Sequence, residues 1–104
     1  MRNYKLNTEK SYGILGNPVN VFSREKDAFL IAEGWQYNDL FRQYKKSVAP
    51  FYAVVLDLDR NRLVFNNGSY FTPAELDYHL GNDKITRDKI YSFVKELKKR
   101  EILA

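Results

Sequence analysis

The segment Phe71–Leu103 reads FTPAELDYHLGNDKITRDKIYSFVKELKKREIL, and it decides the fold of the C-terminal third of this 104-residue chain. Its first residues contain a capping box, in which the Thr72 hydroxyl can accept a hydrogen bond from the N–H of Glu75. Pro73 follows at the first helical position, where its missing N–H costs nothing. This pattern predicts a helix that begins after Thr72 and ends at Gly81.

A second helix is expected after a polar turn at residues 82–84. Thr86 is its predicted N-cap, because a threonine hydroxyl can bind a free amide of the first turn. Apolar residues then recur at helical spacing on one stripe: Ile90, Phe93, Val94 and Leu97. Basic residues crowd the end of this helix, where the macrodipole favours cations: Lys95, Lys98, Lys99 and Arg100. Residues 72–104 are therefore expected to form a pair of helices.

Before this pair, the sequence pattern changes from helical to alternating. Residues 51–59 (FYAVVLDLD) and 62–65 (RLVF) are rich in β-branched and aromatic side chains, which favour strands. The residues between the two runs predict a turn near 59–62. Asn66-Asn67-Gly68 is a second turn signal, because Asn and Gly tolerate positive φ. Residues 51–71 are thus predicted to form a β-hairpin.

Two helices are predicted in residues 23–47. Ser23 can cap the first, which continues through an apolar run to a stop at Gly34. The second is expected from Gln36 to Lys46. Its apolar residues recur at i, i+3, i+4 and i+7, as on one face of a helix: Tyr37, Leu40, Phe41 and Tyr44.

Residues 1–21 show no regular period. Gly13, Gly16 and Pro18 interrupt any helix, so we expect an ordered arm that contains a short strand or a docking segment. Its apolar residues are Tyr12, Ile14, Leu15 and Val19. Together the segments predict one small α+β domain over residues 1–104, made of the arm (1–21), a region of two helices (23–47), a β-hairpin or small antiparallel sheet (51–71) and a helix-turn-helix-like pair (72–104).

The composition limits the classes of protein to consider. Seventeen Lys and Arg against thirteen Asp and Glu give a net charge of +4, which suits a nucleic-acid partner but is also common in soluble proteins. The absence of cysteine excludes disulfides, thiolate metal sites and cysteine nucleophiles. No apolar run approaches the roughly 18 residues of a membrane span and the N-terminus has no signal-peptide core, so we expect a cytoplasmic protein without a membrane partner. Frequent Lys, Asn, Tyr and Ile resemble the residue usage of AT-rich bacterial, phage or plasmid genomes.

The spacing LDYHLG, a polar turn, ITRDKI and then FVKELKKREIL resembles the winged helix-turn-helix family. In that family the helix after the turn typically enters a DNA groove. The resemblance implies that Leu76 and Leu80 belong to a supporting helix and that Ile90, Val94 and Leu97 lie on the packed face of a recognition helix. It also implies that Ile102 and Leu103 begin the strand that leads into the wing.

Helical geometry turns the opposite side of this last helix outward. Residues on that side or on its flanks could contact phosphates, which fix the register, or base edges, which specify sequence. The candidate nucleic-acid-binding residues are Lys84, Arg87, Lys89, Tyr91, Ser92, Lys95 and Lys99. From Gly81 to Arg100 the chain carries seven basic and three acidic residues, and this local excess equals the net charge of the whole chain.

The sequence contains no catalytic or metal-binding pattern. Asp57 and Asp59 resemble the start of a calcium loop, but Arg62 stands where that loop needs glycine. Both carboxylates are expected to face outward beside a hairpin turn. His79, the only histidine, is expected at a helix end rather than in a catalytic pair. We therefore predict no catalytic residue, no metal and no cofactor.

Three functions remain open at this point. The leading hypothesis is a small non-enzymatic regulator that binds DNA, or a component of the nucleic-acid machinery, through its winged-helix-like half. The alternative is a phage- or plasmid-type protein that inhibits or adapts a host enzyme by direct binding, with Tyr and Phe side chains as the contact surface. Trp35 could anchor such a surface, although we expect this single tryptophan in the core. The third is a basic ribonuclease toxin, because such enzymes can work with Arg, Lys and Tyr alone.

Overall fold

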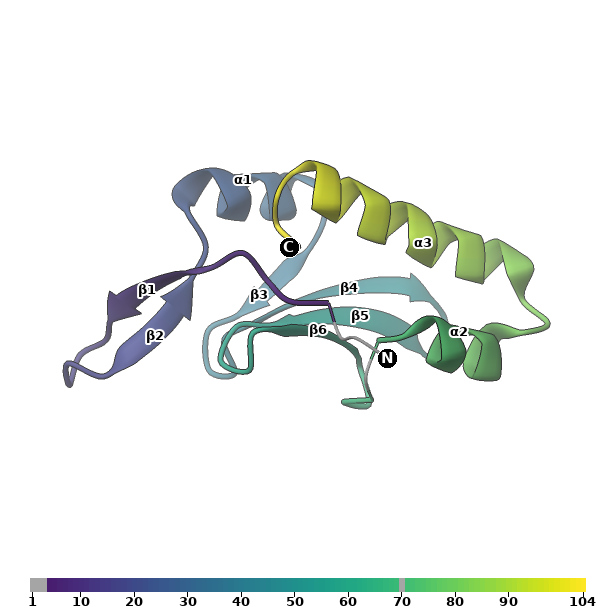
Figure 1. Cartoon of the computed structure of the whole chain (residues 1–104), viewed down its shortest axis with the longest axis horizontal. Coiled ribbons are helices and arrows are strands. Elements are labelled where there is room, and N and C mark those ends of the chain that lie inside the picture. Colours follow the sequence, from purple (N-terminus) through teal and green to yellow (C-terminus); the bar gives the residue numbers. More distant parts are fainter. Residues whose placement is uncertain (1–3, 70) are drawn as a thin grey trace.

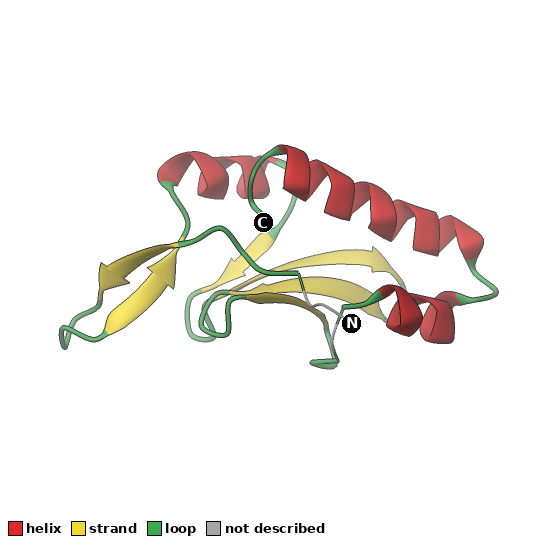
Figure 2. Cartoon of the chain, viewed as in Figure 1, coloured by secondary structure: helices red, strands yellow, loops and turns green. Residues whose placement is uncertain are grey.

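The computed structural model describes residues 4–69 and 71–104, and in this part of the chain two of three helices lie over one face of a four-stranded sheet (Figure 1). The sheet is antiparallel, with the strand order β3 (Gln36–Asn38), β4 (Gln43–Ala49), β5 (Tyr52–Asp57) and β6 (Arg62–Phe65). The helices are α1 (Arg24–Ala32), α2 (Pro73–Leu80) and α3 (Lys84–Lys99). A separate two-stranded sheet, β1 (Glu9–Tyr12) with β2 (Pro18–Val21), projects from one end (Figure 2). The predicted α+β class is confirmed.

The hairpin predicted in residues 51–71 is confirmed as β5 and β6. Val54 pairs with Phe65 and Asp57 pairs with Arg62, so the turn between the strands spans residues 58–61. Asn61 adopts a φ of 53° in this turn, a conformation that asparagine tolerates better than most residues. β5 lies between β4 and β6, and nearly all of its residues are buried, as expected for a central strand.

The helix expected from Gln36 to Lys46 is wrong, because this segment forms β3, a turn and β4. Tyr37 and Tyr44 lie opposite each other across the strand pair, with ring centroids 4.7 Å apart. Leu40 and Phe41 occupy the turn and are exposed instead of sharing a buried face with the tyrosines. Four apolar residues thus had helical spacing by coincidence, and pairing with β5 outweighed that local pattern.

The first predicted helix of this region is confirmed as α1. The Ser23 hydroxyl accepts a hydrogen bond from the N–H of Lys26 at 3.3 Å, which is the expected N-cap contact. Gly34 follows the helix with a φ of +92°, a conformation that favours glycine. Trp35 is then buried in the core, as predicted.

α2 begins as predicted, because the Thr72 hydroxyl accepts a hydrogen bond from the N–H of Glu75 and Pro73 occupies the first turn. The predicted N-cap of α3 is wrong: the cap is Asp83, and Thr86 lies inside the helix. A carboxylate oxygen of Asp83 accepts from the Thr86 N–H at 3.0 Å, and the Thr86 hydroxyl donates to the other at 2.6 Å. The aspartate therefore starts the helix three residues earlier than expected.

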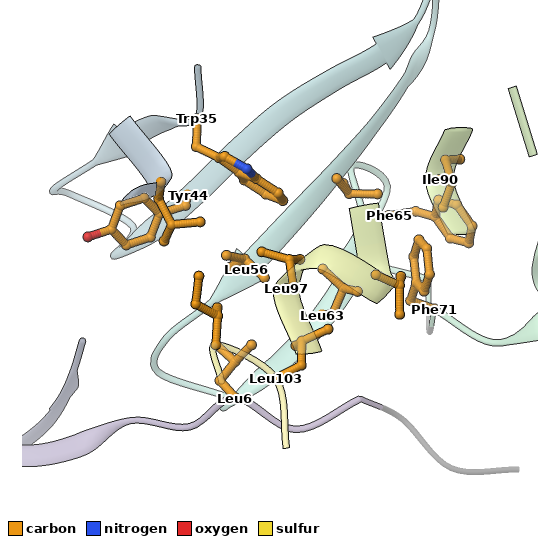
Figure 3. Packing of buried hydrophobic residues seen from close by; sticks show 14 of the residues in the cluster. Leu6, Trp35, Tyr44, Leu56, Leu63, Phe65, Phe71, Ile90, Leu97 and Leu103 are labelled. Atoms are coloured by element: carbon orange, nitrogen blue, oxygen red, sulfur yellow. The ribbon is translucent and has the colours of Figure 1, made fainter. Parts of the chain in front are cut away.

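The core lies between the sheet and the helices and also includes Leu6 and Leu103, near the two ends of the chain (Figure 3). Side chains from the sheet, from the segment before α2, from α3 and from the segments near both ends of the chain meet there: Leu6, Leu56, Leu63, Phe71, Ile90, Leu97 and Leu103. Leu6 and Leu103 form an isolated antiparallel bridge. Ile102 and Leu103, which the winged-helix resemblance assigns to a strand before the wing, are buried beside the N-terminal segment.

The arm predicted at residues 1–21 includes the β1–β2 hairpin, and its first three residues lie outside the described part of the chain. Ser11 pairs with Val19 and Tyr12 with Pro18. The hairpin extends the molecule to 47 × 25 × 23 Å along its principal axes (Figure 1). The expectation of a short strand in the arm is thus confirmed as two strands.

Candidate nucleic-acid interface

α3 separates a buried face from an exposed one. Its buried side chains recur three or four residues apart and pack towards the sheet: Thr86, Ile90, Val94 and Leu97. The predicted apolar stripe is thereby confirmed, with Phe93 half-buried at its margin. Because a helix rises 1.5 Å per residue, the 16 residues of α3 extend over about 24 Å. The opposite side of the helix faces away from the sheet along this whole length (Figure 1).

Most of the predicted nucleic-acid-binding residues lie on the exposed side of α3. Those that the structure leaves exposed are Lys84, Lys89, Tyr91, Ser92, Lys95 and Lys99. We call the four lysines of this set, Lys84, Lys89, Lys95 and Lys99, the lysine face. None of them forms an ion pair within residues 4–69 and 71–104. Their ammonium groups are therefore open to an anion from outside the chain.

Arg87 differs from the other candidates, because it is half-buried and engaged within the protein. Its guanidinium forms an ion pair with Asp77 at 3.2 Å, and this pair connects α3 to α2. A phosphate would have to compete with that carboxylate. Arg87 is thus suited to holding the two helices together rather than to binding an external anion.

Tyr91 and Ser92 place polar groups beside the lysine face. Partial burial, and then the negative charge of Asp77, raise the pKa of Tyr91. Its hydroxyl therefore stays protonated at neutral pH and can donate a hydrogen bond. The Ser92 hydroxyl donates to the Asp88 carbonyl one turn earlier, at 3.0 Å, and retains its capacity to accept.

Two further basic residues near the end of α3 pack against the body of the protein. The Lys98 ammonium lies 4.8 Å from the ring centroid of Tyr4, and the Arg100 guanidinium lies 4.7 Å from that of Phe29. Arg100 also forms an ion pair with Glu96 at 3.3 Å. Cation–π contacts of this kind stabilise the fold. The positive charge counted in the sequence from Gly81 to Arg100 is thus divided between packing contacts and the lysine face.

The two aspartates considered for metal binding have different environments. The prediction that both face outward is wrong for Asp57, which is buried and accepts a hydrogen bond from the Arg60 guanidinium at 3.0 Å. Asp59 is half-exposed and forms an ion pair with Arg42 at 2.7 Å. In the described part of the chain, no three His, Cys, Asp or Glu residues are grouped as metal ligands would be.

His79 lies in the last turn of α2, as the sequence predicted. Its Nε2 is 3.2 Å from a Glu75 carboxylate oxygen one turn earlier, and its ring meets the Phe65 ring edge-on at 5.8 Å. These contacts anchor the imidazole to the end of the sheet.

Sequence reasoning missed several contacts around α3. The Lys46 ammonium lies over the Phe93 ring at 4.8 Å and donates to the Glu33 carbonyl. This contact had no signal in the sequence, because residues 36–46 were predicted to form a helix. No sequence pattern indicated the ion pair between Arg87 and Asp77, because it depends on how α2 packs against α3.

Comparisons of the chain with protein-family models, with curated proteins and with solved structures give no match. None of the helices in the described residues has the length and apolar character needed to cross a bilayer. The class of the molecule is therefore defined by its own geometry: a small α+β domain with a long amphipathic helix whose outer side is cationic.

Proposed function

We propose that this protein is a small non-enzymatic regulator that binds duplex DNA through the lysine face of α3. The observation that carries the proposal is the set of four exposed lysines, unpaired among the described residues, on a helix whose other face is buried in the core. Unpaired cations on a rigid helix can release counterions from a phosphate backbone, and this release provides most of the affinity of non-specific binding.

The position of α3 supports this proposal. The helix is fixed by its buried side chains, so the lysine face is presented without a large loss of backbone entropy on binding. Lys95 and Lys99 lie one turn apart on the same side and can contact neighbouring phosphates. Tyr91 and Ser92 beside them can hydrogen-bond to phosphates, sugars or base edges.

A titration of a fluorescent duplex of about 20 base pairs by anisotropy tests the proposal, repeated from about 50 to 200 mM salt. We expect micromolar or tighter binding at low salt, and a linear decrease of log K with log salt concentration. The variant Lys95→Glu/Lys99→Glu should bind at least about tenfold more weakly, because it replaces two phosphate contacts with two repulsive charges.

A matched control separates the lysine face from net charge. Lys10→Glu/Lys45→Glu changes two exposed lysines outside α3, and each double variant lowers the formal net charge from +4 to 0. The control should retain more affinity than the α3 variant. Equal losses would assign binding to net charge alone, and no binding of wild type to duplex would refute the proposal.

A further inference from the structure

The tip of the β1–β2 hairpin exposes large apolar side chains. Tyr12 is 77% exposed, Leu15 is 86% exposed, and Ile14 between them is fully exposed. We call these three residues the tip. The hairpin projects from the end of the molecule (Figure 1), so no part of the described chain covers the tip. Contiguous apolar groups on a projecting element are characteristic of an interaction site.

The hairpin holds the tip in a defined conformation. The Gly13 N–H donates to the Asn17 carbonyl and the Gly16 N–H to the Gly13 carbonyl, both at 2.9 Å. At the base of the hairpin, the Asn20 amide donates to the Leu58 carbonyl at 3.0 Å, and the Arg42 guanidinium donates to the Asn20 carbonyl. These contacts order the hairpin before any partner binds, which lowers the entropic cost of association.

The distal part of the hairpin carries no charge. No charged residue occurs from Ser11 to Phe22, although the chain as a whole carries a net charge of +4. Two copies that met through their basic surfaces would repel each other. At the distal part of the hairpin they meet without that repulsion, so this part of the molecule suits contact with a second copy.

A second exposed apolar patch lies at the same end of the molecule, in the turn between β3 and β4. Leu40 is 83% exposed and Phe41 is 60% exposed. We call these two residues the turn patch. The adjacent Arg42 connects this turn to Asn20 at the base of the hairpin, and Asp59 neutralises its charge. The chain therefore carries two apolar surfaces near one another. The tip of one molecule could pack on the turn patch of a second molecule.

We propose that the protein forms a two-fold symmetric dimer in which the tip of each chain packs on the turn patch of the other. A two-fold axis makes the contacts reciprocal, so both tips and both turn patches become buried and the assembly closes at two chains. A lipid surface fits less well, because Glu9 offsets Lys10 at the base of the hairpin and no cluster of basic residues flanks the tip in the sequence.

Sedimentation velocity over about 1–200 µM protein, without nucleic acid, tests the dimer. We expect a monomer–dimer equilibrium that persists at high salt, since the contact is apolar. The tip variant Ile14→Ser/Leu15→Ser and the turn variant Leu40→Ser/Phe41→Ser should each weaken dimerisation at least about tenfold. Ile85→Ser is the matched control, because Ile85 is exposed at the start of α3 and should not affect the equilibrium.

A mixture of the two variants tests the reciprocal contact itself. Either variant alone has no intact pair of surfaces, whereas the mixed dimer keeps one, between the tip of the turn variant and the turn patch of the tip variant. The mixture should therefore associate more strongly than either variant alone. Circular dichroism verifies that each variant is folded.

Three results would overturn the proposed dimer. The first is a wild-type monomer over the whole concentration range. The second is a dimer that the tip variant does not weaken. The third is a turn variant that dimerises normally, which would place the tips against each other or against a different surface. Tip-dependent binding of the monomer to neutral phosphatidylcholine vesicles would assign the tip to lipid instead. None of these results bears on DNA binding, which depends on the lysine face.

Discussion

The Tyr44 hydroxyl donates a hydrogen bond to a carboxylate oxygen of Asp27, and this contact joins β4 to α1. The Tyr44 ring is buried between those of Phe22 and Tyr37, at centroid distances of 5.6 and 4.7 Å. Burial raises the pKa of Tyr44 well above its ordinary value, and the hydrogen bond to Asp27 raises it further. The phenol therefore keeps its proton at pH values where an unfolded chain would lose it.

Stability should consequently fall at alkaline pH. The contribution of Tyr44 is fully present below a pH of about 10 and is lost as the pH rises through the folded-state pKa. One such group changes the free energy of unfolding by at most about 1.4 kcal/mol per pH unit. Urea unfolding of wild type and Tyr44→Phe should be measured at several pH values. The difference in free energy of unfolding that favours wild type should decrease above a pH of about 10. Parallel pH profiles for the two proteins would contradict the assignment to Tyr44.

The buried carboxylate of Asp57 should matter more for stability than the half-exposed carboxylate of Asp59. Asp57→Ala removes the acceptor for the Arg60 guanidinium and should cost about 1–3 kcal/mol in free energy of unfolding. Asp59→Ala breaks the half-exposed pair with Arg42, which should cost only about 0–1 kcal/mol. Urea unfolding of both variants measures the difference. Equal losses would show that burial of Asp57 does not determine its contribution.

The N-cap of α3 can be verified by substitution. Asp83→Ala should lower the melting temperature, whereas Asp83→Asn should retain most of the stability because asparagine is also a good cap. The hydrogen bonds from Thr86 lower the pKa of Asp83, so its contribution is present above the ordinary aspartate range and is lost as the pH falls through the folded-state value. Thermal melts at neutral and acidic pH test both statements. A larger effect of Thr86→Val than of Asp83→Ala would instead favour Thr86 as the cap.

Arg87 and Lys95 should contribute differently to DNA binding. Lys95→Ala should weaken duplex binding and reduce the salt slope by about one, as expected for the loss of one phosphate contact. Arg87→Ala should alter the salt slope less, because its guanidinium is paired with Asp77. Anisotropy titrations at several salt concentrations compare the two variants. An equal loss of slope would show that Arg87 leaves Asp77 to bind phosphate.

Local signals predicted the elements whose formation depends on neighbouring residues. Ser23 and Thr72 identified the starts of α1 and α2, and the β-branched and aromatic residues of β5 identified a strand of the hairpin. Each of these signals acts within a few residues, so it is visible in the sequence. The apolar stripe of α3, and hence the position of the lysine face, could be predicted for the same reason.

The remaining features depend on contacts between distant segments. Residues 36–46 satisfy a helical period, and pairing with β3 and β5 makes Gln43–Ala49 a strand. Asp83 and Thr86 are both acceptable caps by residue type, and the structure selects the aspartate. The pair between Arg87 and Asp77 arises from the packing of α2 against α3, which no spacing within either helix could indicate.

The bridge between Leu6 and Leu103 has a consequence for how the chain acquires its structure during synthesis. The Asn7 N–H donates to the Ile102 carbonyl and the Ala104 N–H donates to the Lys5 carbonyl, both at 2.9 Å. The N-terminal segment can pair with β6 earlier, through the bridge between Lys5 and Arg62, but its contacts with residues 102–104 form only after these residues have left the ribosome. The part of the core that Leu6 shares with Ile102 and Leu103 therefore stays incomplete during elongation and closes only after residues 102–104 have left the exit tunnel.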